Sequence, residues 1–268
     1  MAITTMDGTL AGFQPPQFFN KVLSGTLVAN RPFSTFFIGG IPGAATAPTP
    51  GVAGEALTTY PGQLPFSNPV SGNSYLARFA AGSSAQIGTF LLCDRLWHNS
   101  GINVNTATAQ TINSVAWPAR DTNGSTNGEG VHIGLEISTG TGVGAATPSI
   151  SYTDQSGNSG ASGSLIAAYG ASSLAGAFYP FSLAAGDTGV RSIQSITLNN
   201  GMTSGTIHLV AYRILAVVGV SNTVAAGYID PLTGGMPRLY DNTVPFVIFV
   251  PGGTTTTSLS GQMIVTQG

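Results

Sequence analysis

The sequence contains very little charge. Charged residues make up 7% of the 268 positions, Lys21 is the only lysine, and the formal net charge is -2. An ordinary soluble domain has roughly 25% charged residues. Eight scattered basic residues give no electrostatic footprint for nucleic acid, so we expect no nucleic-acid partner. The surface must be largely neutral, and we expect neighbouring copies or another protein to cover much of it.

Disulfide pairs and long apolar runs are also missing. The single cysteine, Cys93, excludes an intrachain disulfide. The most apolar runs, residues 214–220 and 244–250, are too short to span a bilayer, so we expect buried strands there and no membrane partner. The first residues, "MAITTMDGTLAG", lack the basic and apolar regions of a secretion signal. These features predict a protein made in the cytoplasm of its host.

Proline and glycine are abundant, and nine of the 16 prolines lie before Val70. Proline lacks a backbone donor and favours extended geometry in the residue before it. Residues 1–75 are therefore predicted to form an extended Pro/Gly/Phe-rich arm, with one short helix around residues 18–23. Six phenylalanines of this arm are the predicted subunit-interface residues: Phe13, Phe18, Phe19, Phe33, Phe36 and Phe37.

Two positions for these aromatic side chains remain open. They would be costly to leave in water, so they pack either on this chain's own β domain or on another subunit. Packing on another subunit predicts that deletion of residues 1–40 leaves a soluble β domain that no longer self-associates. Unfolding of the truncated protein would show instead that the arm belongs to the chain's own core.

Residues 76–268 have the pattern of a mainly β domain. In "GVHIGLEIS" the apolar positions Val131, Ile133, Leu135 and Ile137 alternate with polar or small ones, as in a half-buried strand. Further strand candidates are "AFYPFSL", "VRSIQSITL", "TIHLVAYRIL", "VPFVIFV" and "GQMIVTQ", separated by turn residues. Residues 138–164 resemble long exposed loops. We expect an antiparallel β-sandwich or jelly roll.

The stretch "LLCDRLWHNSG" groups a cysteine, an aspartate and a histidine, which are the residue types of nucleophilic catalysis. On a strand, Cys93 and His98 point to opposite faces, whereas Asp94 and His98 share a face about 13 Å apart. In a helix Cys93 still faces away from His98. We therefore interpret Cys93 as a small buried thiol.

No metal site or cofactor site is predicted. The oxygen-bearing residues of "DTNGSTNGEG", from Asp121 to Glu129, fail the EF-hand pattern and fit a hairpin loop. His132 with Glu136, and His208, occur singly on strands without the spacing of metal ligands. The sequence has no Walker loop, no G-x-S-x-G and no H-E-x-x-H. We expect a protein that is not an enzyme.

Several segments resemble structural proteins of tailed bacteriophages: "LLCDRLWHNSG", "ARDTNGSTNGEGV", "AGDTGVRSIQSITL" and "PRLYDNTVPF", together with the aromatic arm and the nearly uncharged β domain. Within that class the resemblance implies a capsid decoration (cement) protein. Such a protein binds the major capsid protein on the exterior of the virion, usually as a homotrimer, and stabilises contacts between capsomers.

Two other classes of function remain as alternatives. A phage tail or receptor- and glycan-binding module would use exposed aromatics such as Trp97, Trp117 or Tyr152 as stacking platforms. A hydrolase would need one pocket with Cys93 or a serine beside a histidine.

The interpretation of Cys93 as a buried thiol is testable. Burial raises a thiol pKa and removes the reactive thiolate, so we expect slow alkylation of the native protein. Cys93→Ala and Cys93→Ser should leave binding intact. Rapid native-state alkylation that also abolishes an activity would contradict the interpretation.

Overall fold

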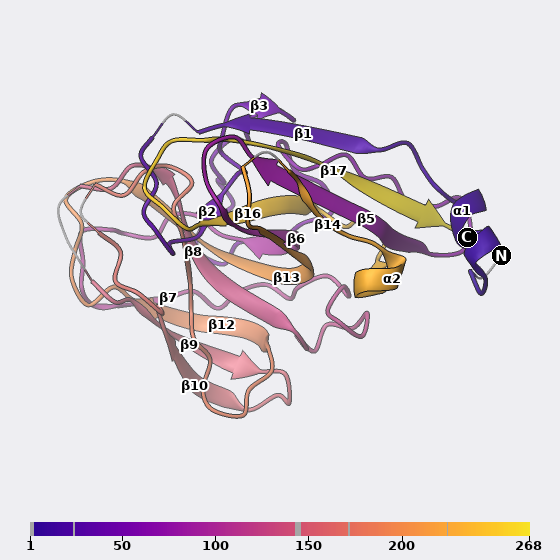
Figure 1. Ribbon diagram of the computed structural model, residues 1–268. Coiled ribbons are helices and arrows are strands. Elements are labelled where there is room, and N and C mark those ends of the chain that lie inside the picture. Colours follow the sequence, from indigo (N-terminus) through magenta and orange to yellow (C-terminus); the bar gives the residue numbers. More distant parts are fainter. Residues whose placement is uncertain (1–2, 24, 143–145, 171, 224) are drawn as a thin grey trace. The chain divides into compact units, whose positions relative to one another are not determined.

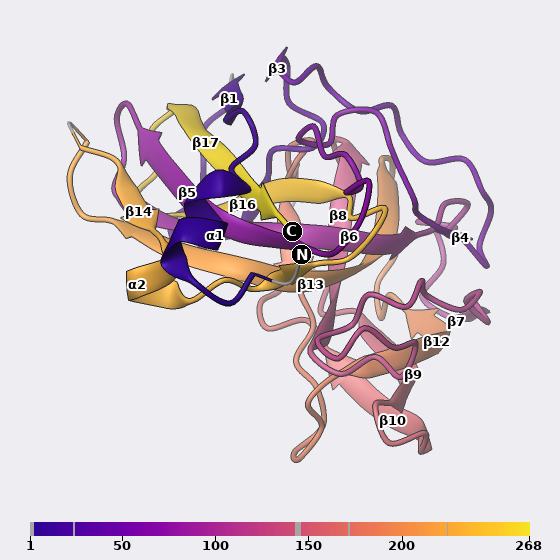
Figure 2. The same cartoon turned by 90° about the vertical axis from the view of Figure 1, so that its right-hand side faces the viewer.

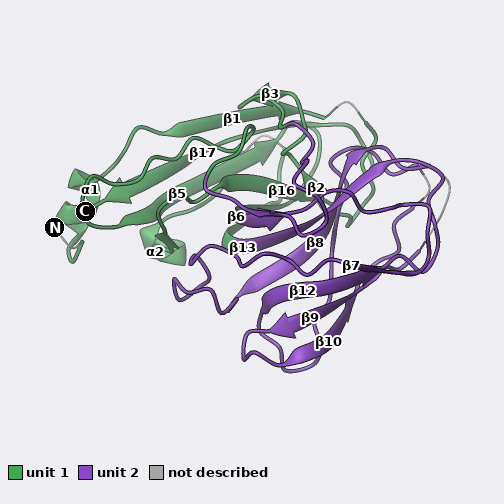
Figure 3. Cartoon of the chain, turned by 180° about the vertical axis from the view of Figure 1, so that it is seen from behind, with its two compact units in different colours: residues 1–45, 59–94, 214–268 green, residues 46–58, 95–213 purple. Residues whose placement is uncertain are grey.

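The computed structural model describes residues 3–23, 25–142, 146–170, 172–223 and 225–268. Over these residues the chain is mainly β, with two short helices (Figure 1). It divides into two compact units, which Figure 3 shows in different colours. Unit 1 contains residues 1–45, 59–94 and 214–268, and unit 2 contains residues 46–58 and 95–213. The strands β6 (Gly88–His98) and β13 (Thr206–Val220) each contribute residues to both units.

Unit 1 is an antiparallel β-sandwich. One layer has the strand order β14-β5-β17-β1-β3, with β15 also paired to β5. The other layer pairs residues 88–94 of β6 with β16, and β16 with β2. The remaining elements of this unit are α1 (Met6–Ala11), β1 (Gln17–Val22), β2 (Phe33–Ser34), β3 (Gly40–Ile41), β5 (Ser74–Ser83), β14 (Gly227–Ile229), α2 (Pro231–Gly234), β15 (Arg238–Leu239), β16 (Pro245–Pro251) and β17 (Ser258–Gln267).

The core of unit 1 lies between these two layers. Phe79 and Met263 from the first layer and Phe90 and Phe249 from the second are all fully buried in one apolar cluster. The helix α1 lies beside the end of β17 in Figures 1 and 2. Its end is fixed there by a 2.9 Å hydrogen bond from the Gln267 N–H to the Gly12 carbonyl.

The N-terminal segment is part of this sandwich. Residues 17–22 form the strand β1, paired with β17 along its whole length, so the expected helix around residues 18–23 is wrong. Burial alternates along β1, with Phe19 fully buried and Phe18 half exposed, which is the pattern of a strand and not of a helix. The Phe19 ring lies over Gly261, where a Cβ atom would be 2.6 Å from the ring.

The boundary expected at residue 75 does not coincide with the division into units. Residues 1–45 and 59–75 belong to unit 1, whereas residues 46–58 belong to unit 2. The physical reason is that β1 completes the sheet that contains β17, the last strand of the chain. Deletion of residues 1–40 would remove β1 from this sheet, which favours packing of the segment on its own chain; the outcome of the deletion stays a prediction.

The only lysine has a structural position in this segment. Lys21 is 2% exposed, and its Nζ donates hydrogen bonds to the carbonyls of Ile38 at 2.9 Å, Pro42 at 2.6 Å and Gly43 at 3.4 Å. Burial lowers the pKa of Lys21 to about 8, so the ammonium remains mostly charged at neutral pH. One buried cation thus holds the turn that contains β3.

Unit 2 also consists of two antiparallel layers. One layer has the strand order β10-β9-β12-β7, and in the other β8 pairs with β11 on one side and with residues 206–213 of β13 on the other. The remaining elements of this unit are β4 (Glu55–Ala56), β7 (Ala109–Thr111), β8 (Val131–Thr139), β9 (Ser149–Asp154), β10 (Ser159–Ser164), β11 (Phe178–Pro180) and β12 (Val190–Thr197).

The core of unit 2 contains the apolar positions read from "GVHIGLEIS", but the strand is not half-buried as expected, because Gly134 and Glu136 on its other face are buried too. Val131, Ile133, Leu135 and Ile137 of β8 are all fully buried in one apolar cluster, which also contains residues of β9 and β12. The mainly β, antiparallel fold is therefore confirmed. The expectation of long exposed loops over residues 138–164 is wrong, because β9 and β10 form a hairpin there; residues 143–145 lie outside the described part of the chain.

Among the described residues, no helix has the length and apolarity needed to cross a membrane.

The position of β1 makes a prediction about two neighbouring phenylalanines. Phe19→Ala removes a fully buried ring and should lower the free energy of unfolding by about 3–5 kcal/mol. Phe18→Ala removes a ring that is 50% exposed, and should change it by about 0.5 kcal/mol or less. Denaturant unfolding of the two variants measures the difference. Equal effects would mean that the segment does not pack in its own chain.

Candidate functional site

The only cysteine lies on a strand, as the sequence predicts. Cys93 and Asp94 are both fully buried on β6 in unit 1. Burial and the charge of Asp94 raise the pKa of the Cys93 thiol well above its ordinary value. Asp94 accepts a 2.9 Å hydrogen bond from the backbone N–H of Val244. This environment keeps the thiol protonated and away from solvent, which opposes a nucleophilic role.

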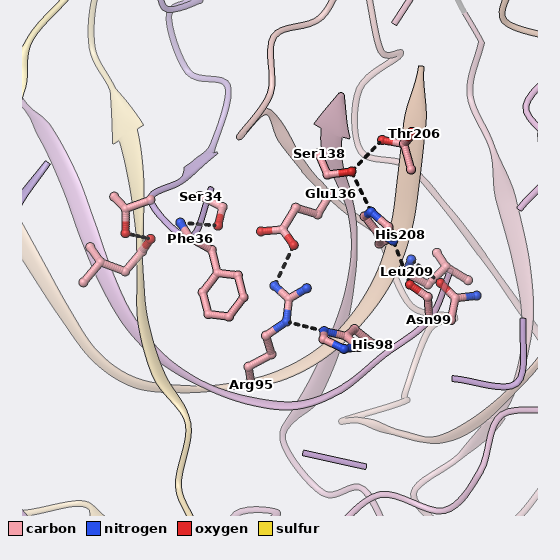
Figure 4. Close-up of polar contacts among 12 residues, drawn as sticks. Ser34, Phe36, Arg95, His98, Asn99, Glu136, Ser138, Thr206, His208 and Leu209 are labelled. Atoms are coloured by element: carbon pink, nitrogen blue, oxygen red, sulfur yellow. Dashed lines mark hydrogen bonds and ion pairs between the residues drawn. The ribbon is translucent and has the colours of Figure 1, made fainter. Parts of the chain in front are cut away.

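Unit 2 contains a buried ion pair. Arg95 of β6 donates a 2.6 Å hydrogen bond from Nη1 to Oε2 of Glu136 on β8, and both side chains are completely inaccessible to solvent (Figure 4). Arg95 also donates from Nε to Nδ1 of His98 at 3.2 Å. His98 Nε2 lies 3.1 Å from Oε1 of Glu55 on β4. These four side chains form a connected polar chain that ends at the half-exposed Glu55.

A second histidine completes the cluster. His208 of β13 lies opposite Glu136 in the β8 to β13 register. Its Nδ1 is 2.7 Å from the carbonyl oxygen of Asn99, and its Nε2 is 2.7 Å from Oγ of Ser138 (Figure 4). The Asn99 side chain accepts a hydrogen bond from the N–H of Leu209 at 2.8 Å. His208 is therefore held by a main-chain partner that follows β6 and a side-chain partner on β8.

The hydrogen bonds define opposite tautomers for the two histidines. Arginine donates only, so His98 must accept at Nδ1 and carry its proton on Nε2. The Asn99 carbonyl accepts only, so His208 carries its proton on Nδ1 and accepts from Ser138 at Nε2. Burial, the charge of Arg95 and neighbouring His208 lower the pKa of His98 to about 2. Burial also lowers the pKa of His208, although Asn99 and Glu136 oppose that shift.

The Ser138–His208 pair has the spacing of a nucleophilic serine and its base. Two features oppose that chemistry. The third partner is the Asn99 carbonyl, and not a carboxylate that would stabilise an imidazolium. Burial and the charge of Arg95 also disfavour the protonated imidazole that proton abstraction would produce. The cluster fits a buried structural network better than a catalytic site.

Spacing in the sequence does not bring these residues together. It pairs His132 with Glu136 and leaves His208 isolated, whereas in the structure Glu136 pairs with Arg95 from another strand. A usable signal was present, because Arg95, Glu136 and His208 each lie among mostly apolar residues of a buried strand. Charged or histidine side chains on several buried strands indicate mutual pairing, since an unpaired buried charge is very costly.

The loop that begins at Asp121 is organised by its own backbone. The Asp121 carboxylate accepts hydrogen bonds from the N–H groups of Asn123, Ser125, Gly128 and Glu129. These bonds lower the pKa of Asp121 against the opposing effect of its burial. Over the described residues, no group of three or more His, Cys, Asp or Glu side chains is placed to hold a metal ion.

The aromatic residues proposed as glycan-stacking platforms lie inside unit 2. Trp97 and Tyr152 are fully buried, and Trp117 is 2% exposed. The two indole rings pack with centroids 5.2 Å apart. These three side chains are therefore core residues and cannot stack on a ligand in this structure.

The predicted subunit-interface phenylalanines have three different environments. Phe19, Phe33 and Phe36 are buried in unit 1, and Phe37 is half-buried with its ring 5.7 Å from that of Phe36. Phe13 and Phe18 are 41% and 50% exposed. Contact with another subunit stays a prediction, and only Phe13 and Phe18 keep a large accessible ring for it.

Phe18 lies on a nearly uncharged sheet surface, which we call the outer face of unit 1. The cross-strand register places Phe18, Gln262, Ala80 and Tyr228 in one row over β1, β17, β5 and β14. Tyr228 is 56% exposed, and the guanidinium of Arg78 lies 4.8 Å from its ring centroid. A groove of about 420 Å³ runs beside Phe18 on this face.

The interior holds a large share of the few charges. Eight of the 18 charged side chains are buried, which leaves four arginines and six carboxylates at least partly accessible. The accessible surface is thus more neutral than the composition alone implies. The buried charged residues are Lys21, Asp94, Arg95, Arg120, Asp121, Glu136, Asp154 and Arg213.

No protein-family model and no curated protein matches this chain. Among solved structures, the chain is similar to the crystal structure of the infectious bursal disease virus VP2 subviral particle, with 10% identity over 96% of this chain and 80% of that chain and a TM-score of 0.21. It is also similar to the structure of infectious bursal disease virus Gt strain, with 11% identity, 95% and 42% coverage and a TM-score of 0.13. Similarity at these TM-scores carries no functional argument.

The ion pair of unit 2 makes a prediction about paired substitutions. Arg95→Met alone and Glu136→Leu alone each leave one buried charge uncompensated, and each should cost about 3–5 kcal/mol of stability. The double variant removes both charges and should recover most of that loss. A thermodynamic cycle from denaturant unfolding measures the coupling. Additive losses would show that the two side chains do not depend on each other.

Proposed function

We propose that this protein is a non-enzymatic structural protein of a phage particle. In this proposal it binds the capsid exterior through the major capsid protein and stabilises contacts between capsomers, as a decoration protein does. It acts as a homo-oligomer, with a trimer favoured. The resemblance of several sequence segments to tailed-phage structural proteins gives the proposal its viral context.

The observation that carries the proposal is the distribution of charge. Only four arginines and six carboxylates are accessible on this 268-residue chain. So few charges contribute little to hydration of the surface, and their field attracts a charged ligand only weakly. Exposed apolar side chains such as Phe18 and Val22 lie on the outer face of unit 1. Burial of such a neutral surface against other subunits supplies roughly 25 cal/mol per Å² of apolar area.

The alternative, a tail or glycan-binding module, has less support. Its aromatic platforms Trp97, Trp117 and Tyr152 are core residues. The hydrolase alternative needs a pocket with Cys93 or a serine beside a histidine. Cys93 is fully buried, and so is His208, the histidine beside Ser138. We therefore keep adhesion between subunits as the proposed activity.

Self-association tests the role of the exposed phenylalanines. Phe13→Ala and Phe18→Ala should weaken the oligomer, because each removes an exposed ring from unit 1. Ile166→Ala is the matched control, since it removes an exposed apolar side chain, 63% exposed, from unit 2. Sedimentation velocity measures the oligomeric state. An unchanged oligomer in both phenylalanine variants would exclude these rings from the contact.

Attachment to particles should resist salt. Exposed ion pairs are screened over about 10 Å at 0.1 M salt and over less at higher concentration, whereas sulfate strengthens apolar burial and urea weakens it. We expect the protein to co-sediment with purified virus particles at about 1 M sodium chloride and to be released by urea. Release of most copies by sodium chloride would show that exposed arginines such as Arg31, Arg78 and Arg238 dominate the contact.

A further inference from the structure

Residues 46–58, which we call the clasp segment, belong to unit 2 although the residues on both sides of them in the sequence belong to unit 1. The segment contains β4, in which Glu55 and Ala56 pair with His98 and Trp97. Trp97 Nε1 donates to the Ala53 carbonyl at 3.1 Å, and Asn99 Nδ2 donates to the Val52 carbonyl at 3.1 Å. The segment is therefore held mainly by the end of β6.

The clasp segment has one ionisable side chain, Glu55. Its carboxylate oxygen lies 3.1 Å from His98 Nε2, and its side chain is 48% exposed, whereas the His98 side chain is completely buried. Glu55 thus lies at the accessible end of the polar chain that continues through His98 to Arg95 and Glu136. Any opening of the segment removes the carboxylate that covers the His98 ring.

The bonds around His98 admit only a neutral ring. Arg95 Nε–H points at Nδ1 over 3.2 Å, so a proton on Nδ1 would place two N–H groups against each other. The remaining ring proton on Nε2 is donated to Glu55. Protonation of His98 is therefore incompatible with the bonds that connect the clasp segment to Arg95.

The charged and titratable groups around His98 come from every adjoining element of the network. Glu55 is on β4, Arg95 is on β6, Glu136 is on β8 and His208 is on β13. Arg120 lies in the loop between β7 and β8 and donates to the carbonyls of Leu57 at 2.8 Å and Arg95 at 3.1 Å. The Arg95 guanidinium adjoins Nδ1, the ring nitrogen that accepts, which opposes a second proton there.

We propose that the clasp segment is an acid-sensitive element, closed while His98 is neutral and released when this ring takes up a proton. The sign follows from the two states of the ring. In the closed state the pKa of His98 is about 2, and in an opened, hydrated state it moves toward its ordinary value of 6.5. The equilibrium constant for closure of the clasp segment is therefore highest, and independent of pH, above about pH 6.5. It falls by up to about tenfold for each pH unit below that value.

Hydrogen exchange on the full chain tests this proposal. The amides of Leu57 and Ser100 donate across the contact between the clasp segment and the end of β6, to the carbonyls of Leu96 and Gly51, and report the closed segment. After correction for the intrinsic rate of exchange, their opening constant should be flat above about pH 6.5 and should rise by up to about tenfold per unit below it. A flat profile below that pH overturns the proposal.

The amides of β8 (Val131–Thr139) separate local release from unfolding of unit 2. They should stay protected under conditions that open the clasp segment, because the proposed release leaves the β8 pairing in place. Parallel loss of protection in β8 and in the clasp segment would show that the whole unit unfolds in acid, and would overturn the proposal.

Two substitutions identify the titrating group. His98→Gln can accept from Arg95 and donate to Glu55 without titrating, so the clasp segment should lose its pH dependence. His132→Gln is the matched control on β8, where burial lowers the pKa of a histidine beside Tyr212, and it should keep the wild-type profile. A wild-type profile in His98→Gln assigns the proton to another group and contradicts the proposal.

If His98→Gln does not fold, a surface substitution supplies the second measurement. Glu55→Gln changes a half-exposed side chain and preserves an acceptor for His98 Nε2. We expect it to raise the opening constant at pH 7 several-fold and to retain the increase below pH 6.5. Unchanged opening at pH 7 would show that the contact between Glu55 and His98 does not hold the segment, and would also overturn the proposal.

Discussion

The ion pair between Arg95 and Glu136 sets the chemistry of the interior of unit 2. Two charges without solvent contact require each other, because either one alone is strongly destabilising. The guanidinium then determines the state of its neighbours: it fixes His98 as an acceptor at Nδ1 and opposes a positive charge on His208. Glu55, at the accessible end, is the point at which this buried arrangement meets solvent.

The small number of charges connects the interior to the proposed function. Buried cations stabilise both units: Lys21 donates hydrogen bonds to three carbonyls of a turn, and Arg120 donates to the carbonyls of Leu57 and Arg95. The accessible surface is left with few charges, and exposed rings such as Phe18 lie among small neutral residues. A surface of this kind suits lasting contact with other neutral surfaces better than capture of charged ligands.

Sequence reasoning succeeded where a pattern is local. The alternation from Val131 to Ile137 predicted β8 because a strand with one apolar face repeats every two residues. It failed for β1, where the partner of Phe19 is Gly261 at the far end of the sequence. It failed for β10, "SGASGS", because this strand has no large apolar side chain to show the period. The polar network was missed for the same reason as β1, because its residues are distant in the sequence and are brought together only by strand pairing.

The interleaving of the two units bears on how such a chain could exchange parts with a related one. Residues 95–213 leave and rejoin unit 1 through β6 and β13, so they have the form of one continuous insertion. A recombination event confined to that insertion would separate it from residues 46–58 and leave Trp97 Nε1 and Asn99 Nδ2 opposite a foreign backbone. Transfer of unit 2 alone as a working module therefore requires the exchange of two separate segments of the gene, those that encode residues 46–58 and residues 95–213.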